Sequence, residues 1–351
     1  MKMKGWLLFL SVSLLMISCE DDPKPSGKYD NGAFIVNEGA FLAGNGSITF
    51  YNFAADEAEQ NIFLNDAGTF AGDVVQSMTF HDDVALIVVN GDSKIEIANN
   101  ATFESIETIT DVLIDKPRYI QVIDDKAYIS VWGAYDQFFS LIDSYVLVYD
   151  LNTGSVVTTI DTDEGTENLL YTGNKLFASN FNYGSSNTVS VINPANNTLI
   201  DNVELSAGPA GMVTDANGKL WIVCVGGFGD TNGYLFRLNP ATLAIEQEIT
   251  ITGIPGMDLA TTTNKQNILY SVGNDVFSLP ISATSEATEE LFAPDGLTSL
   301  STLSVDPSTG NIWIGDAPSF TSPGKVYVYT STGTSITSFD AGIGPTQIVF
   351  K

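Results

Sequence analysis

Short apolar runs separated by polar turns repeat along most of the chain, and residues 208–252 give the clearest copy. This copy opens with a Gly-Pro pair and a short apolar strand around Met212, followed by a polar turn and the apolar run 220–225. A glycine-rich loop, a strand at 234–238, a second turn and a last strand at 244–251 complete it. The pattern therefore predicts four strands in about 45 residues, which is the size of one propeller blade.

The spacing of the repeat predicts the number of blades. Four of the repeated units open at a proline, and the intervals between them are 92, 46 and 90 residues, counted over Pro117, Pro209, Pro255 and Pro345. These intervals are close to two, one and two steps of about 46 residues, so one period runs through the chain.

The two ends of the repeated region complement each other. Residues 344–350 have the pattern of a unit's first strand with nothing after it, whereas the first unit, which begins at Gly32, lacks that strand. We therefore predict an all-β fold, a seven-bladed β-propeller with four-stranded blades over residues 32–351. The C-terminal strand is expected to join the N-terminal blade and so close the ring, which removes its open edges.

The first 31 residues carry a different pattern. Two lysines precede the apolar run 6–17, which is too short to span a membrane as a helix and is typical of a signal peptide. The run ends in the letters MISC, which resemble the lipobox of bacterial lipoproteins. We predict a signal peptide over residues 1–18, lipidation of Cys19, and an acidic, proline-containing tether over residues 19–31. The acidic residues that follow Cys19 resemble signals for the outer leaflet, so we expect a surface-exposed outer-membrane protein held by its lipid anchor only.

Charge and cysteine content narrow the function. The chain has 14 basic and 42 acidic residues and a net charge of −28, which becomes −30 when Lys2 and Lys4 leave with the signal peptide. A surface this acidic repels phosphate backbones, so nucleic acid is not an expected partner. With Cys19 lipidated, the only other cysteine is Cys224, which lies in an apolar strand and is expected to be an inert core thiol.

The long loops of the predicted propeller favour a binding role. In this fold the loops between second and third strands share one end of the ring with the connections between blades, and here they are long and rich in aromatic residues. Irregular loops on a rigid scaffold are where binding sites usually lie. We predict ligand contacts by Asn37, Phe41, Arg118, Trp132, Tyr135, Phe138, Asn180, Phe181, Tyr183, Phe228, Asp316 and Phe320. The alternatives are that individual rings cap the core beneath their own loop, and that Arg118 pairs with one of the surplus carboxylates.

The sequence contains no recognisable catalytic pattern. The single histidine, His81, lies in a polar turn at the other end of the predicted ring, so it cannot serve a Ser-His-Asp site among the long loops. Zinc-ligand spacings and a glycine-rich phosphate loop are both missing from the sequence. Carboxylates such as Asp163, Asp306 and Asp316 remain available for a calcium site or an acid/base pair, but such groupings arise easily among 42 acidic residues. We predict a protein without catalytic residues, a metal site or a cofactor.

Two stretches carry a resemblance to known families. The repeat centres KAYISVWG and KLWIVCVG resemble those of YncE-like propellers, and GAFIVNEGAFLAGNGSITFYNF, after an acidic lipoprotein leader, resembles the cobalamin-binding surface lipoproteins of the BtuG type. The resemblance implies capture of a corrinoid (vitamin B12) as a bound ligand and its delivery to a TonB-dependent outer-membrane transporter. Two other classes stay open: a glycan-binding or adhesion propeller lipoprotein that interacts with other proteins, and a lactonase-like hydrolase.

Overall fold

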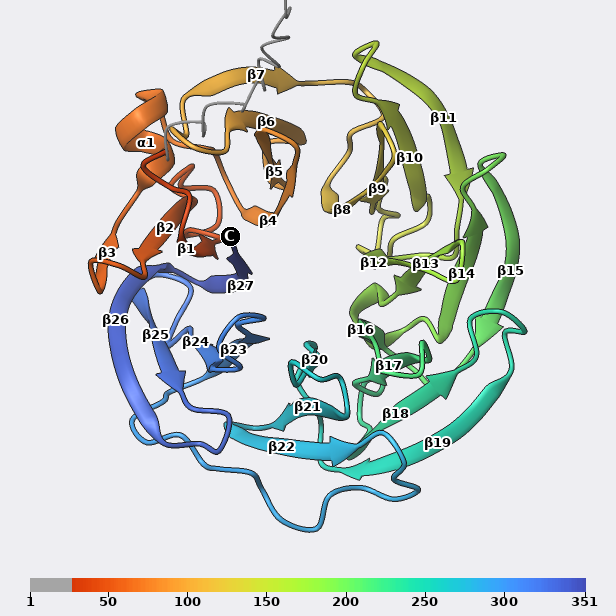
Figure 1. The fold of residues 1–351 in the computed structure, drawn as a ribbon. Helices are drawn as coiled ribbons and strands as arrows, with labels where there is room; N and C mark the ends of the chain where they lie inside the picture. The colour runs from red at the N-terminus through yellow and green to blue at the C-terminus, as the bar shows by residue number, and fades with distance from the viewer. Residues whose placement is uncertain (1–26) are drawn as a thin grey trace, which may run out of the picture.

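Antiparallel strands form seven sheets that stand around a common axis like the blades of a propeller (Figure 1). The structure is a computed structural model, and it describes residues 27–351. The predicted seven-bladed β-propeller is confirmed. The signal peptide, Cys19 and most of the tether lie outside the described residues, so those assignments remain predictions.

The strands follow the chain blade by blade. The first sheet contains β1 (Gly32–Asn37), β2 (Ser47–Asn52), β3 (Glu57–Glu59) and, from the end of the chain, β27 (Pro345–Phe350). The second contains β4 (Val75–His81), β5 (Val84–Val89), β6 (Lys94–Asn99) and β7 (Ser105–Ile109). The third contains β8 (Pro117–Ile123), β9 (Lys126–Val131), β10 (Tyr145–Asp150) and β11 (Ser155–Asp161). The fourth contains β12 (Thr166–Thr172), β13 (Lys175–Asn180), β14 (Thr188–Asn193) and β15 (Thr198–Glu204).

The remaining three sheets continue in the same order. The fifth contains β16 (Pro209–Thr214), β17 (Leu220–Cys224), β18 (Asn232–Leu238) and β19 (Ile245–Thr252). The sixth contains β20 (Ala260–Thr261), β21 (Asn267–Val272) and β22 (Asp275–Pro280). The seventh contains β23 (Leu300–Val305), β24 (Ile312–Asp316), β25 (Pro323–Tyr329) and β26 (Ser335–Ile343).

The ring closes as the sequence predicts. β27 pairs antiparallel with β1, with Phe34 opposite Val349 and Ile35 opposite Ile348. The last strand therefore supplies the innermost position of the first blade, and no innermost edge is left open there.

The second strand of each blade is apolar because both of its faces are covered by neighbouring blades. Leu86 and Ile87 of β5 point to opposite faces, yet both are buried, and they belong to the clusters on the two sides of their blade. In β17 every residue is buried. Such strands read as continuous hydrophobic runs, whereas the outermost strands such as β15 are largely exposed.

The sixth sheet departs from the predicted four strands. It has three strands, and the segment 281–299 occupies the outer side, where it makes one isolated bridge between Phe292 and Val276. This segment is rich in Ser, Thr and Glu, so it lacks the apolar–polar alternation that is typical of a strand. The innermost strand of this blade is also reduced to two residues, β20.

Only two helical turns interrupt the strands in the described part of the chain. They are α1 (Ile62–Ala67), which connects the first blade to the second, and the 3-10 turn η1 (Asn182–Gly184). Neither helix is long and apolar enough to cross a membrane.

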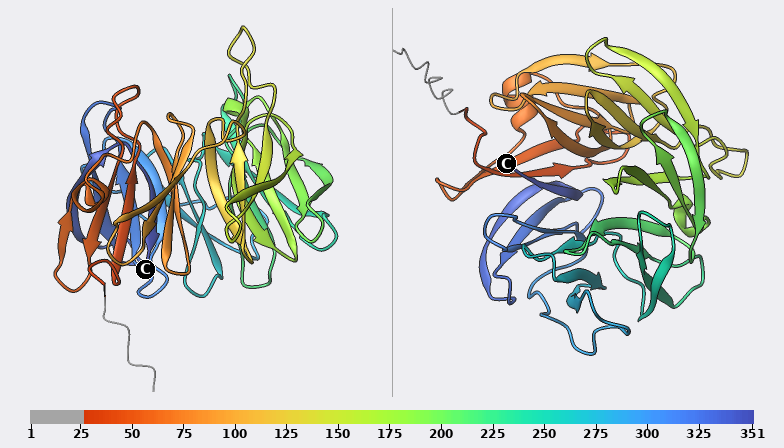
Figure 2. Two further views of the ribbon diagram at one scale, coloured as in Figure 1. Left: turned by 90° about the horizontal axis from the view of Figure 1, so that it is seen from above. Right: turned by 45° about the vertical axis from the view of Figure 1, so that its right-hand side comes forward.

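The two ends of the ring differ in shape (Figure 2). The end that carries the loops between second and third strands is called the loop end here, and the loop after β9 projects furthest from it. The C-terminus lies at the opposite end, which carries the short turns and is called the turn end. The division of loops between the ends agrees with the prediction.

Candidate functional site

Bulges near the start of the innermost strands shape the loop end. In the third and fourth sheets the register shifts between residues 117 and 120 and between residues 166 and 169. The hydroxyl of Ser130 accepts the Tyr119 N–H at 2.9 Å, and Ser179 serves the fourth sheet in the same way at 3.1 Å, so serines replace the interrupted ladder. A bulge re-aims the side chains that it contains.

The re-aimed side chains of the third and fourth blades are Arg118 and Glu167, and they meet in a bidentate ion pair. Arg118 Nη2 lies 2.7 Å from Glu167 Oε1 and Arg118 Nε lies 2.9 Å from Oε2. The side chains are 12% and 3% exposed. The indole N–H of Trp132 donates to Glu167 Oε2 at 3.0 Å, and the guanidinium lies 3.9 Å from the centre of the Trp132 ring. Arg118 therefore pairs with a carboxylate, which was the alternative to a ligand contact in the sequence analysis.

Glu167 was missed in the sequence. It stands one residue after the start of its innermost strand, which is where Arg118 stands in the preceding blade. That equivalence is readable from the repeat, but the pairing of the two residues depends on bulges that the sequence does not reveal.

Two other ionisable residues near the pair, Glu38 and Tyr119, have raised pKa values. Burial raises the pKa of Glu38, which Arg118 lowers in part and Glu167 raises further. Burial also raises the pKa of Tyr119, and the Glu167 carboxylate adds to this effect. One guanidinium thus serves two carboxylates, and Tyr119 stays a neutral hydrogen-bond donor at physiological pH.

Four of the predicted aromatic residues come together beside the pair. The cluster consists of Trp132 and Tyr135 from the loop after β9, and Phe181 and Tyr183 from the loop after β13. The Trp132 and Tyr183 ring centres are 5.3 Å apart, and the Tyr135 and Tyr183 hydroxyl oxygens are 3.1 Å apart. Tyr183 is 56% exposed, whereas Trp132 is buried. Two neighbouring blades therefore build one aromatic cluster with a buried base and an open edge.

Three predicted contact residues lie inside the blades instead. Asn37 is fully buried and donates to Ile35 O and Thr49 Oγ1, and Asn180 is fully buried and donates to Ser190 Oγ. Asp316 is 4% exposed and accepts two backbone N–H groups of the connection before β23. All three residues lie at the ends of second strands, where their side chains form hydrogen bonds with neighbouring buried polar groups. They are not available to a ligand in this structure.

The remaining four predicted residues form an exposed rim around the loop end. These rim phenylalanines come from four different blades, and their exposed fractions are 74%, 76%, 108% and 72% for Phe41, Phe138, Phe228 and Phe320. None of them caps the core beneath its own loop. All four lie on irregular loops at one end of a rigid scaffold, where binding sites usually lie.

The other residues considered in the sequence have structural surroundings. Cys224 is fully buried, and burial raises the pKa of its thiol, as expected of a core cysteine. Asp163 accepts hydrogen bonds from Thr188 Oγ1 and Asn202 Nδ2. Within residues 27–351, His, Cys, Asp and Glu side chains form no group of three that would hold a metal ion.

The partly buried carboxyl of Asp258 gives a testable pH dependence. Burial raises the pKa of Asp258 in the sixth blade, against the opposing hydrogen bonds from Thr302 and the Leu303 N–H. Its contribution to stability is therefore complete below its unfolded pKa of about 3.9 and is lost as the pH rises through the folded pKa. We expect Asp258→Asn to gain stability relative to the parent above about pH 4, by about 1.4 kcal/mol for each pH unit between the two pKa values. Urea unfolding of both proteins from pH 3.5 to 8 measures this, and a constant difference across that range would contradict it.

Comparison with known proteins places the chain in a family. No curated protein matches it in sequence. Among solved structures, a quinonprotein alcohol dehydrogenase-like protein from Bacteroides thetaiotaomicron is similar with a TM-score of 0.72 and 12% identity, over 92% of this chain and 78% of that one. A functionally unknown protein from Desulfotomaculum acetoxidans has a TM-score of 0.66 and 12% identity, over 91% and 98%. Hydrazine synthase from Kuenenia stuttgartiensis has a TM-score of 0.57 and 12% identity, over 75% and 85%.

At such identities these likenesses concern the fold alone. The family model that matches is described as a domain of unknown function, DUF5074, and it covers residues 31–343, which is nearly the whole propeller. The chain therefore belongs to the DUF5074 family.

Proposed function

We propose that this propeller captures a small ligand at its loop end without transforming it, and that the ligand is a corrinoid. The observation that carries the proposal is the arrangement of that end, where four blades carry exposed phenylalanines and the third and fourth blades hold the largely buried Arg118–Glu167–Trp132 base beside an aromatic cluster. A rigid base with an adaptable aromatic rim is the usual design of a recognition surface.

The base supports binding because it is fixed before any ligand arrives. Glu167 holds both the Arg118 guanidinium and the Trp132 indole, and Tyr183 packs on Trp132. Preorganised side chains lose little conformational entropy on binding, so their contacts are converted into affinity efficiently. Arg118 acts here as a positioning residue, since its donors are directed to Glu167.

The chemistry of the open edge suits a broad, amide-edged molecule. The Tyr135 and Tyr183 hydroxyls each donate and accept hydrogen bonds, and the loops around them are rich in Asn, Ser and Gly. A corrinoid has a wide apolar plane for ring contacts and amides around its edge for these polar groups. The resemblance of residues 32–53 to BtuG-type lipoproteins points to the same ligand.

The rim supports a second part of the proposal, delivery to a TonB-dependent outer-membrane transporter. Phe138 and Phe139 in the loop after β9 are 76% and 82% exposed, which is unfavourable for an isolated surface. A partner that covers the rim would bury these rings and enclose a ligand held at the base. With lipidation at Cys19, such a complex would lie at the outer surface of the outer membrane.

The experiment is a titration of the protein lacking its signal peptide, beginning at Glu20, with cyanocobalamin. Calorimetry gives the stoichiometry, and the visible absorbance of the cobalt chromophore reports its surroundings. We expect one-to-one binding. Absence of both heat and spectral change at micromolar protein would rule out the corrinoid, and a glycan panel would then test the adhesion alternative.

A matched pair of variants locates the site. Tyr183→Ala is expected to weaken cyanocobalamin binding by roughly tenfold or more, because truncation of a central aromatic contact typically removes 1–2 kcal/mol or more. The control is Tyr171→Ala, because Tyr171 is likewise partly exposed, at 38%, but lies near the turn end. Equal affinities of the two variants would show that the ligand binds elsewhere.

A further inference from the structure

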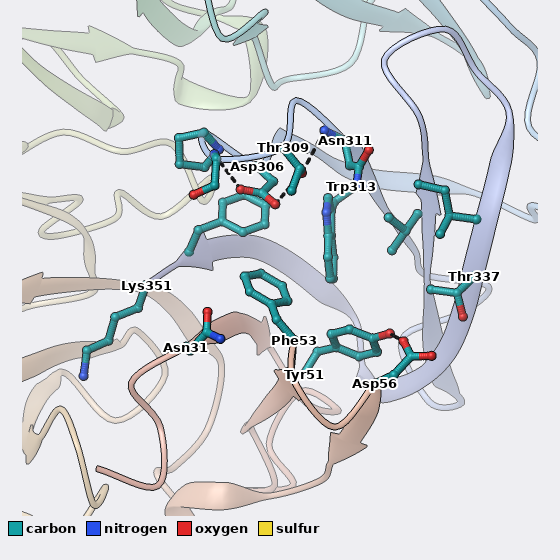
Figure 3. A pocket seen from close by; sticks show the side chains of 15 residues that line it. Asn31, Tyr51, Phe53, Asp56, Asp306, Thr309, Asn311, Trp313, Thr337 and Lys351 are labelled. Atoms are coloured by element: carbon teal, nitrogen blue, oxygen red, sulfur yellow. Dashed lines mark hydrogen bonds between the residues drawn. The ribbon is translucent and has the colours of Figure 1, made fainter. Parts of the chain in front are cut away.

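A cavity lies at the turn end of the ring, between the first and seventh blades (Figure 3). Its volume is about 430 Å³, within the range of small-ligand sites. The first blade contributes Tyr51, Phe53 and Asp56, the seventh contributes Asp306 and Trp313, and the closing strand contributes Phe350. We call this space the closure pocket. It is separate from the loop-end site and independent of the function proposed for it.

Aromatic rings form much of the wall of the closure pocket. The Trp313 ring centre lies 5.4 Å from that of Tyr51, 5.9 Å from that of Phe53 and 5.6 Å from that of Phe350. The interplanar angles are 77°, 59° and 79°, so Tyr51 and Phe350 meet the indole edge to face, Phe53 is tilted against it, and none of the three stacks on it. Trp313 is therefore held in one orientation by rings from both blades and from the closing strand.

The indole N–H of Trp313 is the unusual feature of the pocket. Trp313 is only 3% exposed, and among the residues that the structure describes its Nε1 atom has no hydrogen-bond partner. Buried tryptophan N–H groups normally have an acceptor, and an exception calls for an explanation.

The fifth blade shows what the usual arrangement is. Trp221 of that blade pairs with Val213, which lies two residues before Asp215 in the chain. Its Nε1–H donates to Asp215 Oδ2 at 2.9 Å. Trp313 holds the equivalent position in the seventh blade, because it pairs with Ser304, which lies two residues before Asp306.

In the seventh blade the turn is one residue longer, and the Asp306 carboxylate is directed differently. It accepts the Ser308 N–H at 2.8 Å and the Thr309 hydroxyl at 2.5 Å. The seventh blade thus keeps the tryptophan and the aspartate but separates them, and it has a cavity beside the indole.

The walls define which ligand fits. The ligand must offer an acceptor to the Trp313 N–H and an apolar face to the rings. It must also tolerate or donate to two carboxylates, those of Asp306 and Asp56, where Asp56 already accepts from the Tyr51 hydroxyl. Each carboxylate has about four acceptor sites, so both keep capacity for further donors. Lys351 also lines the pocket, but its ammonium is paired with Asp30 at 2.9 Å, so the two carboxylates disfavour an anion. A simple cation supplies no acceptor for the indole.

We propose that the closure pocket binds one ring of a neutral carbohydrate. A sugar hydroxyl both donates and accepts, so it satisfies Trp313 and the carboxylates together, and the C–H face of the ring packs on aromatic side chains. The pocket is large enough for a monosaccharide unit and spans the two blades that close the ring.

The test uses the Trp313 indole as its own reporter. The protein that begins at Glu20 has three tryptophans, Trp132, Trp221 and Trp313, and therefore three indole N–H signals in a nitrogen-15 correlation spectrum. The probes are the methyl glycosides of glucose, galactose and mannose at millimolar concentration. We expect at least one to shift the Trp313 signal saturably while the Trp221 signal stays in place. Trp313→Phe assigns the signal and should weaken binding about fivefold, the loss typical of one neutral hydrogen bond.

The controls separate this site from others. Phe138→Ala, at the rim of the loop end, should leave glycoside binding unchanged. Trp221→Phe should lower the urea midpoint more than Trp313→Phe does, because only Trp221 has a hydrogen-bond partner to lose.

Three results would overturn the proposal. They are a Trp313 signal that no glycoside moves, binding that survives Trp313→Phe but is lost in Phe138→Ala, and a shift produced by benzylammonium and by none of the sugars. The outcome of the cyanocobalamin titration affects none of these readings.

Discussion

Replacement of Glu167 by glutamine is expected to lower the free energy of unfolding by about 3–5 kcal/mol. The substitution keeps the shape of the side chain but removes the charge that faces the Arg118 guanidinium, whose side chain is 12% exposed. The amide also replaces an oxygen that accepts from both Arg118 and the Trp132 indole. A buried guanidinium without a full counter-charge is costly, and the partly buried Glu38 carboxyl compensates only in part because burial raises its own pKa.

A double-mutant cycle shows whether the pair is the cause. Arg118→Met combined with Glu167→Gln removes both charges, so it should recover much of the stability that Glu167→Gln alone loses. The control is the exposed pair Lys325–Asp340, whose side chains are 52% and 78% exposed, and Lys325→Ala should change stability by less than about 0.5 kcal/mol. Urea unfolding at pH 7 provides all the values. A coupling energy near zero would mean that Arg118 and Glu167 do not stabilise each other. The ion pair would then not be what holds the base of the loop-end site rigid.

The fold could be predicted because its signals are local and repeated. In each unit, apolar runs and turn residues indicate where the strands lie. The strand pattern at residues 344–350 has no unit after it, and the first unit, which begins at Gly32, lacks the strand that this pattern supplies. The sixth blade shows the limit of this reasoning. A repeat predicts that segment 281–299 should contain an outer strand, but its own residues lack the alternation that a strand needs.

The site could be predicted only in part, for a physical reason. Strand order determines at which end of the ring each loop lies, so the exposure of Phe41 and Phe228 could be predicted from the sequence. Whether a side chain at a strand end turns outward or inward depends on bulges and on partners far along the chain. The sequence therefore predicts Asn180 as a ligand contact, whereas its side chain hydrogen-bonds within its own blade. The sequence does not indicate Glu167, because its partner Arg118 lies 49 residues away along the chain.

Removal of the closing strand is expected to have the largest effect of all. A chain that ends at Gly344 lacks β27, and with it the antiparallel ladder to β1 and the hydrogen bond in which Gln347 Oε1 accepts the Met78 N–H at 2.7 Å. β1 is buried along its whole length, so its loss of a partner exposes an apolar edge on the inside of the ring. We expect the truncated protein to aggregate or to lose cooperative unfolding, as judged by size-exclusion chromatography and thermal denaturation.

A point substitution tests the same closure without removing backbone. Ile348 is 5% exposed and packs in one cluster with Ile35 and Trp313, so Ile348→Ala should cost about 2–5 kcal/mol. Ile336→Ala is the control, because Ile336 lies on β26 of the neighbouring blade but is 51% exposed, and it should cost less than about 0.5 kcal/mol. If the truncated chain remains a monomer with the urea midpoint of the parent, the ring does not depend on its closing strand. In that case the blades must be held by the six other interfaces alone, and Ile348→Ala would be as mild as its control.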